Sequence, residues 1–247
     1  MIRVENLSKA FGALRAVDHL SFDAVPNKVT SIIGPNGAGK STAFNLIAGT
    51  LPPDAGRVEL DGQDITGLPP YALVRFGLAR SFQITNLFFG LSVFENIRLA
   101  CQTLEPRGRY LRRLTRLQPP RIRAEAVLSQ FGLAEVAGEL VGNLSHGDQR
   151  RVEIAICMAM QPKLLMLDEP TQGMSPAETA EIDTLIRSLA GQVTVLLIEH
   201  DIDLVMGLSD RVIVMHQGRK LFDGTPDAAR RSAEVREAYL GSDHAAA

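Results

Sequence analysis

The chain has 247 residues, 45% of them hydrophobic, so it can bury a full core as one large domain or two closely joined subdomains. Its formal net charge of -2 gives no overall electrostatic reason to bind nucleic acid. The two cysteines, Cys101 and Cys157, lack a Cys-x-x-Cys spacing, which argues against a disulfide framework or a zinc site and predicts buried or idle thiols. Apolar runs such as 193–198 are too short to span a bilayer, and the first residues lack a signal-peptide core. We therefore expect a protein that stays inside the cell.

Strand-like and helix-like patterns alternate along most of the chain. In chain order they predict short strands up to about residue 33, a helix at 42–48, a strand at 57–60 entering a tight hairpin, a mainly helical stretch from about 87 to 160, a strand at 163–167, a helix at 176–189, a strand at 193–198, a hairpin of 211–215 and 220–222, and a final helix at 226–240. Buried strands separated by helices indicate a parallel sheet, whose ligand sites lie at the carboxyl ends of its strands. The stretch 87–160 indicates an inserted helical subdomain.

Residues 34–41 match the phosphate-binding pattern G-x-x-x-x-G-K-[ST] at every constrained position, between a predicted strand and a predicted helix. Glycines there let backbone N–H groups converge on phosphate oxygens, and the helix N-terminus adds partial positive charge. Lys40 is expected to reach the β and γ phosphates, and the Ser41 hydroxyl to ligate magnesium. The expected nucleotide-binding residues of this loop are Gly34, Pro35, Asn36, Gly37, Ala38, Gly39, Lys40, Ser41 and Thr42.

Two adjacent carboxylates, Asp168 and Glu169, follow the apolar run 164–167 at its carboxyl end. Phosphoryl transfer needs one carboxylate in the magnesium shell and another group that positions or deprotonates water. Asp168 suits the metal, directly or through water, and Glu169 suits the base.

The stretch 143–151, Asn-Leu-Ser-His-Gly-Asp-Gln-Arg-Arg, resembles the signature motif of ABC transporter ATPases, whose usual form is L-S-G-G-Q. His146 and Asp148 depart from that form. The resemblance implies that Ser145 and Gly147 bind the γ phosphate of an ATP held by the opposite subunit. The working unit would then be a head-to-tail dimer with two ATP molecules between its subunits.

Other residues match the family in the same order along the chain. Gln83 matches the glutamine that senses magnesium and the attacking water, and His200 matches the switch histidine at the γ phosphate. Phe11 matches the aromatic residue that stacks on adenine, with packing in the core as the alternative. Residues 173–176 occupy the D-loop with an atypical spelling, Gly-Met-Ser-Pro. The resemblance thus implies Glu169, His200 and Gln83 as catalytic residues.

The finer spelling of the motifs resembles the ATPases of branched-chain or hydrophobic amino acid uptake systems, and is shared in part with urea-uptake and lipopolysaccharide-export ATPases. It implies a subunit that hydrolyses ATP with Mg²⁺ and energises a membrane importer from the cytoplasmic face of the cell membrane. Its expected partners are a second ATPase subunit, transmembrane permease subunits and, indirectly, an extracytoplasmic solute-binding protein. A nucleic-acid-associated ABC ATPase is disfavoured because the chain has one motif set and no heptad run.

The resemblance also implies the fold class: an α/β P-loop NTPase core with a mainly parallel sheet, an N-terminal antiparallel β subdomain and an inserted helical subdomain. We expect a single nucleotide-binding domain over residues 1–247. The expected parts are an ATP-binding core of 1–86 and 161–225, a helical subdomain with the signature motif at 87–160, and a C-terminal helix and tail at 226–247.

Seven arginines occur without an acidic residue between Glu105 and Glu125. They are Arg107, Arg109, Arg112, Arg113, Arg116, Arg121 and Arg123. A partial amphipathic pattern accompanies them until Pro119 and Pro120 break it. We expect a solvated face of a variable insertion, with contact to anionic lipid or a permease loop as the second interpretation and nucleic acid as the third.

Overall fold

The computed structural model describes residues 1–81, 87–104 and 118–243. Its strands are β1 (Ile2–Phe11), β2 (Leu14–Asp23), β3 (Val29–Ile33), β4 (Ala55–Leu60), β5 (Gln63–Asp64), β6 (Leu78–Arg80), β7 (Leu164–Asp168), β8 (Thr194–Ile198), β9 (Arg211–His216) and β10 (Arg219–Gly224). Its α-helices are α1 (Lys40–Ile47), α2 (Pro70–Phe76), α3 (Val93–Gln102), α4 (Gln118–Gln130), α5 (His146–Ala159), α6 (Pro176–Ala190), α7 (Ile202–Leu208), α8 (Pro226–Arg231) and α9 (Ala233–Asp243), and a 3-10 turn covers Val141–Asn143.

The described strands form two sheets. The first is antiparallel, in the order β2-β1-β4-β5. The second has the order β10-β9-β3-β8-β7-β6, and all of its neighbours are parallel except β9 and β10. This confirms the α/β class with a mainly parallel sheet and an antiparallel sheet contributed by the start of the chain. β4 and β5 form the expected tight hairpin, in which Asp61 and Gly62 both have positive φ.

The parallel strands are apolar throughout because both faces of their sheet are covered. In β7, for example, Leu164 and Met166 face a core shared with α1 and the antiparallel sheet. Leu165 and Leu167 face a second core shared with α3, α5 and α6. The alternation follows the two-residue repeat of a strand. It fixes the register of the strand and therefore the position of Asp168 at its end.

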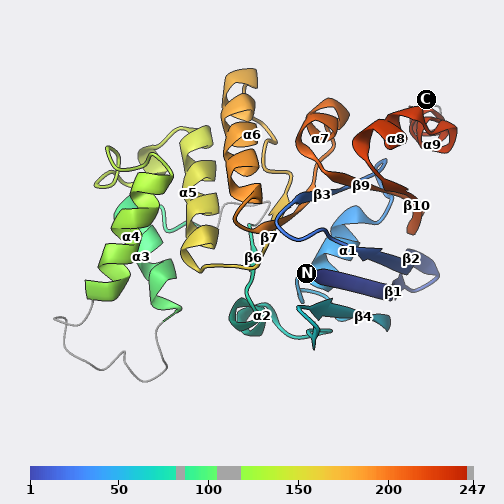
Figure 1. The fold of residues 1–247 in the computed structure, drawn as a ribbon, viewed down its shortest axis with the longest axis horizontal. Coiled ribbons are helices and arrows are strands. Elements are labelled where there is room, and N and C mark those ends of the chain that lie inside the picture. Colours follow the sequence, from blue (N-terminus) through green and yellow to red (C-terminus); the bar gives the residue numbers. More distant parts are fainter. Residues whose placement is uncertain (82–86, 105–117, 244–247) are drawn as a thin grey trace.

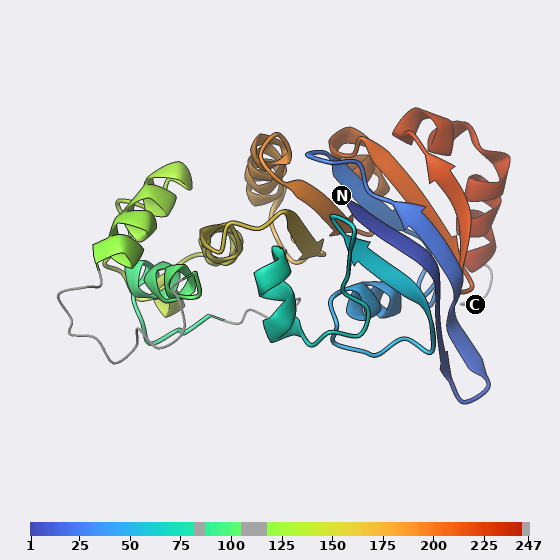
Figure 2. The same cartoon turned by 60° about the horizontal axis from the view of Figure 1, so that its bottom comes forward.

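α3, α4 and α5 pack on one another beyond the β6 edge of the parallel sheet. Figures 1 and 2 both place α3 and α4 at the end of the molecule opposite α8 and α9. Within the described residues, no helix is long and apolar enough to cross a bilayer. Cys101 and Cys157 are both free and buried, as expected, and burial raises the pKa of the Cys157 thiol to about 12.

One sequence-based expectation about helices is wrong. The final helix predicted at 226–240 is two helices, because Ser232 adopts an extended conformation between α8 and α9 and its hydroxyl accepts a hydrogen bond from the Val235 N–H. Pro119 and Pro120, where the partial amphipathic pattern of the sequence stops, lie in the first turn of α4. Proline is tolerated there because the first-turn N–H groups have no partner within the helix.

Candidate active site

The strand order brings the chemical motifs to one edge of the parallel sheet. The phosphate loop follows β3, His200 follows β8 by two residues, Asp168 ends β7, and Arg80 ends β6. β3, β8, β7 and β6 are consecutive neighbours and run parallel, so their carboxyl ends lie side by side. The sheet therefore assembles residues that are far apart in the sequence.

The phosphate loop takes a path that only glycine can follow at two positions. A Cβ on Gly34 would overlap the carbonyl oxygen of Met215, and a Cβ on Gly39 would overlap the carbonyl oxygen of Ala16. Gly39 has φ 97° and immediately precedes α1, which has no side-chain cap. The first-turn N–H groups of this helix, including those of Ser41 and Thr42, therefore lack a capping side chain, and their charge suits an anion such as phosphate.

The Lys40 side chain is buried within this loop. Its Nζ donates to the carbonyl oxygens of Gly34 at 2.6 Å and Pro35 at 3.1 Å. Burial lowers the pKa of Lys40, and the charge of Glu169 opposes that shift. The phosphate loop and the predicted base are therefore close enough to interact electrostatically.

Asp168 is held by Arg80, a residue that the sequence analysis did not single out. Arg80 Nη2 lies 2.9 Å from Asp168 Oδ2, and the two side chains are only 11% and 5% exposed. Arg80 also donates to Asn45 Oδ1 at 2.7 Å, and its guanidinium lies 5.2 Å from the centre of the Phe44 ring. Arg80 thus joins the helix after the phosphate loop to the predicted metal carboxylate. The only sequence feature that could have identified Arg80 is its position as a cationic residue at the end of a short apolar stretch.

Ser41 and Asp168 offer a hydroxyl and a carboxylate, the oxygen ligands that Mg²⁺ prefers. Among the residues that the structure describes, no group of three or more His, Cys, Asp or Glu side chains gathers as a metal cage. A magnesium ion bound through one or two protein oxygens plus phosphate needs no such cage. The donor set fits this ion.

Glu169 adopts φ 44°, which L residues rarely do. Its N–H donates to the carbonyl oxygen of Ile198 at 2.9 Å, so the residue is anchored to the end of β8. Backbone conformations of this kind occur often at functional sites.

His200 has a side chain that is 60% exposed, next to the fully buried Glu199. Glu199 accepts hydrogen bonds from the Thr171 hydroxyl at 2.7 Å and from the Thr171 N–H at 3.1 Å. It also accepts from the His200 N–H at 3.2 Å. Glu199 therefore ties the loop after β7 to His200, a role that sequence reasoning missed.

The signature residues lie at the start of α5 and contact α6. Ser145 caps α5, where its Oγ accepts from the Asp148 N–H and donates to Asp148 Oδ2 at 2.8 Å. The Gly147 N–H donates to Glu178 Oε1 at 3.2 Å, and Glu178 in turn closes a capping box with Ser175. Among the described residues, no hydrogen bond joins Ser145 or Gly147 to the phosphate loop. α5, at whose start the signature residues lie, is apart from α1, the helix that follows the loop (Figures 1 and 2).

Phe11 ends β1 and is 50% exposed, with Lys9 Nζ 5.9 Å from its ring centre. The structure therefore does not place it in the core, the alternative that the sequence left open. Gln83 lies outside the described residues. So do Arg107, Arg109, Arg112, Arg113 and Arg116, whereas Arg121 pairs with Glu125 on the surface of α4.

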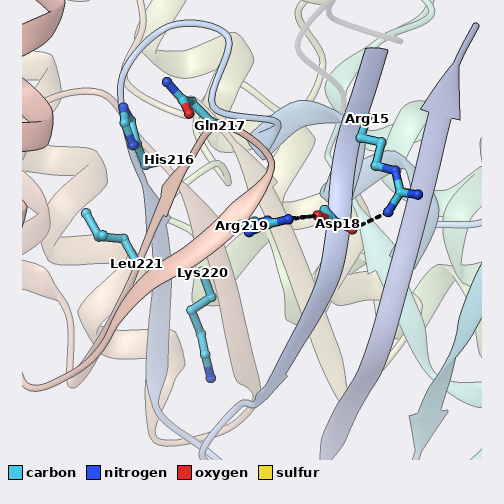
Figure 3. A pocket seen from close by; sticks show the side chains of 7 residues that line it. All are labelled: Arg15, Asp18, His216, Gln217, Arg219, Lys220 and Leu221. Atoms are coloured by element: carbon cyan, nitrogen blue, oxygen red, sulfur yellow. Dashed lines mark hydrogen bonds and ion pairs between the residues drawn. The ribbon is translucent and has the colours of Figure 1, made fainter. Parts of the chain in front are cut away.

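The turn between β9 and β10 links the phosphate loop to β2 through backbone hydrogen bonds. The Gly218 N–H donates to the Ala38 carbonyl, and the Asp18 N–H to the Gly218 carbonyl. Figure 3 shows the Asp18 side chain between Arg15 and Arg219, to which it bonds at 3.1 Å and 2.8 Å beside a cavity of about 470 Å³. Hydrogen bonds from His19 and Arg219 lower the pKa of Asp18 to about 2.

Sequence comparison finds two matching family profiles. One, described as ABC transporter, matches residues 17–172, and the other, described as branched-chain amino acid ATP-binding cassette transporter, matches residues 219–245. The chain is 42% identical over 249 residues to the high-affinity branched-chain amino acid transport ATP-binding protein LivG of Escherichia coli strain K12, with 98% of each chain covered.

Solved structures with the same fold include the ADP conformation of MJ1267, an ATP-binding cassette of an ABC transporter. It is 31% identical, has a TM-score of 0.85, and 98% of each chain is covered. A second is the dimeric post-hydrolysis state of the ATP-binding cassette MJ0796 bound to ADP and Pi. It is 26% identical with a TM-score of 0.75, covering 92% of this chain and 99% of that one.

Proposed function

The chain belongs to the ATP-binding subunits of ABC transporters, and on that premise we propose that it energises an importer of branched-chain amino acids. The family makes it an ATPase. The main support for the proposed active site is that the phosphate loop, the pair Asp168 and Glu169, and His200 all follow the ends of neighbouring strands. The substrate is supported by the relative named for branched-chain amino acid transport and by the second profile over 219–245. This favours amino acids over the urea and lipopolysaccharide alternatives.

The proposed mechanism assigns one task to each side chain. The loop N–H groups and Lys40 bind the phosphates, while Ser41 and Asp168 hold Mg²⁺, which supplies charge neutralisation for the transferred phosphoryl group. Glu169 accepts the proton of the attacking water, and His200 orients that water near the γ phosphate. The protein contributes mainly positioning and electrostatic stabilisation. Gln83 remains a proposed magnesium sensor by family resemblance.

A complete site needs a second subunit. ABC ATPases dimerise, as in the dimeric relative, and α5, which starts at the signature residues, lies apart from α1, which follows the phosphate loop. We propose a head-to-tail dimer in which Ser145 and Gly147 meet the γ phosphate held by the partner. Phe11, half exposed at the end of β1, is proposed to stack on adenine.

An apolar patch suits contact with permease subunits. Phe88, Phe89, Leu91 and Leu140 are all exposed, and backbone bonds join their segments: the Val141 N–H donates to the Leu91 carbonyl. Exposed apolar patches commonly mark interaction sites. We propose that a permease subunit covers this patch and holds the chain at the cytoplasmic face of the membrane. The solute-binding protein would act through the permease.

The proposed division of the chain follows the same logic. A core of 1–86 and 161–225 would carry the nucleotide, and 87–160 would carry the signature motif and the permease patch. Residues 226–247 would add the C-terminal helices. The mutual packing of α3, α4 and α5 supports this division.

The test is uptake by proteoliposomes that hold this chain with the permease subunits and binding protein encoded beside its gene. We expect ATP-dependent uptake of radiolabelled leucine, and none with a Glu169→Gln subunit. Radiolabelled urea serves as the matched alternative substrate. Uptake of urea without leucine would contradict the proposed substrate but leave the ATPase assignment intact.

A further inference from the structure

Arg150 is a buried cation in α5 that the proposed mechanism does not use. Its side chain is 8% exposed. Its Nη2 donates to the Asp168 carbonyl oxygen at 2.9 Å, and its Nε donates to the Pro170 carbonyl oxygen at 3.1 Å. Its Nη1 donates to the buried Glu153 at 2.6 Å. One guanidinium thus joins α5 to the loop that follows β7.

The two carbonyl groups that Arg150 binds lie on either side of Glu169. The peptide unit after Asp168 and the one after Pro170 are both held, and the Glu169 N–H is bonded to Ile198. Between these anchors the residue adopts its rare positive φ. Such a conformation persists only where the surroundings over-determine it. Arg150 and β8 together supply those surroundings.

The chemistry of this contact is specific to arginine. A guanidinium presents donors in a rigid fork, so it can serve two carbonyls and a carboxylate at once, whereas a lysine ammonium is a single compact charge on a flexible stem. Glu153 balances the buried charge, because an uncompensated cation at this depth is costly. Glu153 therefore holds the Arg150 guanidinium, which in turn binds the backbone of the loop that contains Glu169.

We propose that Arg150 is a positioning residue for ATP hydrolysis. It fixes the backbone on both sides of Glu169 and so sets where the base carboxylate lies, and Glu153 holds Arg150 in that orientation. The inference rests on the proposed role of Glu169 as the base.

The first variant is Arg150→Lys, which keeps a cation beside Glu153 and loses the fork. We expect kcat to fall about 10-fold to 100-fold, the range that a displacement of about 1 Å in a site can produce. The KM for ATP and the affinity for a fluorescent ATP analogue with Mg²⁺ should stay unchanged. Arg151→Lys is the matched control, because Arg151 lies next along α5 and pairs with Glu181 and Asp148 instead. Its kcat should stay near that of the unmodified chain.

Introducing Arg150→Lys into the Glu169→Gln variant distinguishes a failure of this inference from a failure of the proposed function. Arg150→Lys should lower kcat in the unmodified chain but not lower the residual rate of Glu169→Gln further. If Glu169→Gln hydrolyses ATP normally, the base assignment fails. If Glu169→Gln is slow and Arg150→Lys reduces both rates by the same factor, Arg150 acts independently of Glu169 and the inference is overturned.

A variant without the ion pair covers the case in which Arg150→Lys does not fold. Arg150→Met combined with Glu153→Leu removes both charges together, which folded proteins often tolerate. We expect this double variant to bind the ATP analogue and to lose kcat as Arg150→Lys does. A folded double variant with the kcat of the unmodified chain would overturn the inference.

Discussion

The Arg80 guanidinium lies 2.9 Å from the Asp168 carboxylate, so the predicted magnesium carboxylate has a buried cationic partner within its own chain. The two residues are 88 positions apart in the sequence and meet because β6 pairs with β7. Since one carboxylate oxygen is engaged by Arg80, the arrangement orients the carboxyl group at the strand end.

The first prediction concerns this ion pair. Arg80→Met should lower the free energy of unfolding by about 3–5 kcal/mol, because it leaves the Asp168 charge buried without its partner. Arg57→Met is the control, since Arg57 pairs with Asp64 on the surface, and it should cost about 1 kcal/mol or less. Urea denaturation of both variants measures the difference. Equal losses of unfolding free energy in the two variants would contradict the prediction that burial makes the Arg80 pair more important for stability than the surface pair.

The second prediction concerns acid stability and Asp18. Its pKa in the folded chain is about 2, below the ordinary value of 3.8, so the unfolded chain binds the proton first as pH falls. The stabilisation by Asp18 is complete above the ordinary value and is lost as pH falls through about 2. Asp18→Asn should therefore be less stable than the unmodified chain near about pH 6, with a gap that narrows below about pH 4. Urea denaturation across this range tests it, and a gap independent of pH would contradict it.

The local parts of the site could be predicted from the sequence because each motif is a short run of residues. The phosphate loop needs glycine at Gly34 and Gly39 for steric reasons that a pattern of eight residues already contains. Asp168 and Glu169 come directly after an apolar strand. Strand order then places them beside His200, and alternating buried strands were sufficient to predict a parallel sheet.

The contacts that position these residues could not be predicted, because they join segments through tertiary packing. In the sequence, Arg80 is only a cationic residue at the end of an apolar stretch, and its contact with Asp168 depends on the pairing of β6 with β7. Arg150 is one of two adjacent arginines in a predicted helix, and the sequence does not show which of them contacts the loop after β7. The break at Ser232 carries no glycine or proline signal.

The third prediction tests the shared site. Ser145→Arg should leave nucleotide binding by the monomer intact but block ATP-driven dimer formation, because bulk and charge would meet the γ phosphate of the partner. The substitution also removes the cap of α5, at a cost of about 1 kcal/mol. Thr225→Arg removes the cap of α8 in the same way and should dimerise normally. Light scattering with ATP reports both, and normal dimers of Ser145→Arg would contradict the composite site.

The fourth prediction concerns the apolar patch. Replacing Phe88 and Phe89 together with Ser should reduce co-sedimentation with permease-containing membranes and leave the basal ATPase rate unchanged. Tyr71→Ser is the control, because Tyr71 is more exposed but lies on α2, outside the two segments that carry the patch. Undiminished co-sedimentation of the double variant would remove the patch from the permease contact.

The assignment of Glu169 as the base is the central claim, and one variant tests it most directly. Glu169→Gln keeps the size of the side chain and the backbone contacts but removes the proton acceptor. Single-turnover hydrolysis should be nearly abolished, while ATP with Mg²⁺ binds normally and drives a stable dimer that light scattering detects. Hydrolysis by Glu169→Gln at the rate of the unmodified chain would contradict the account.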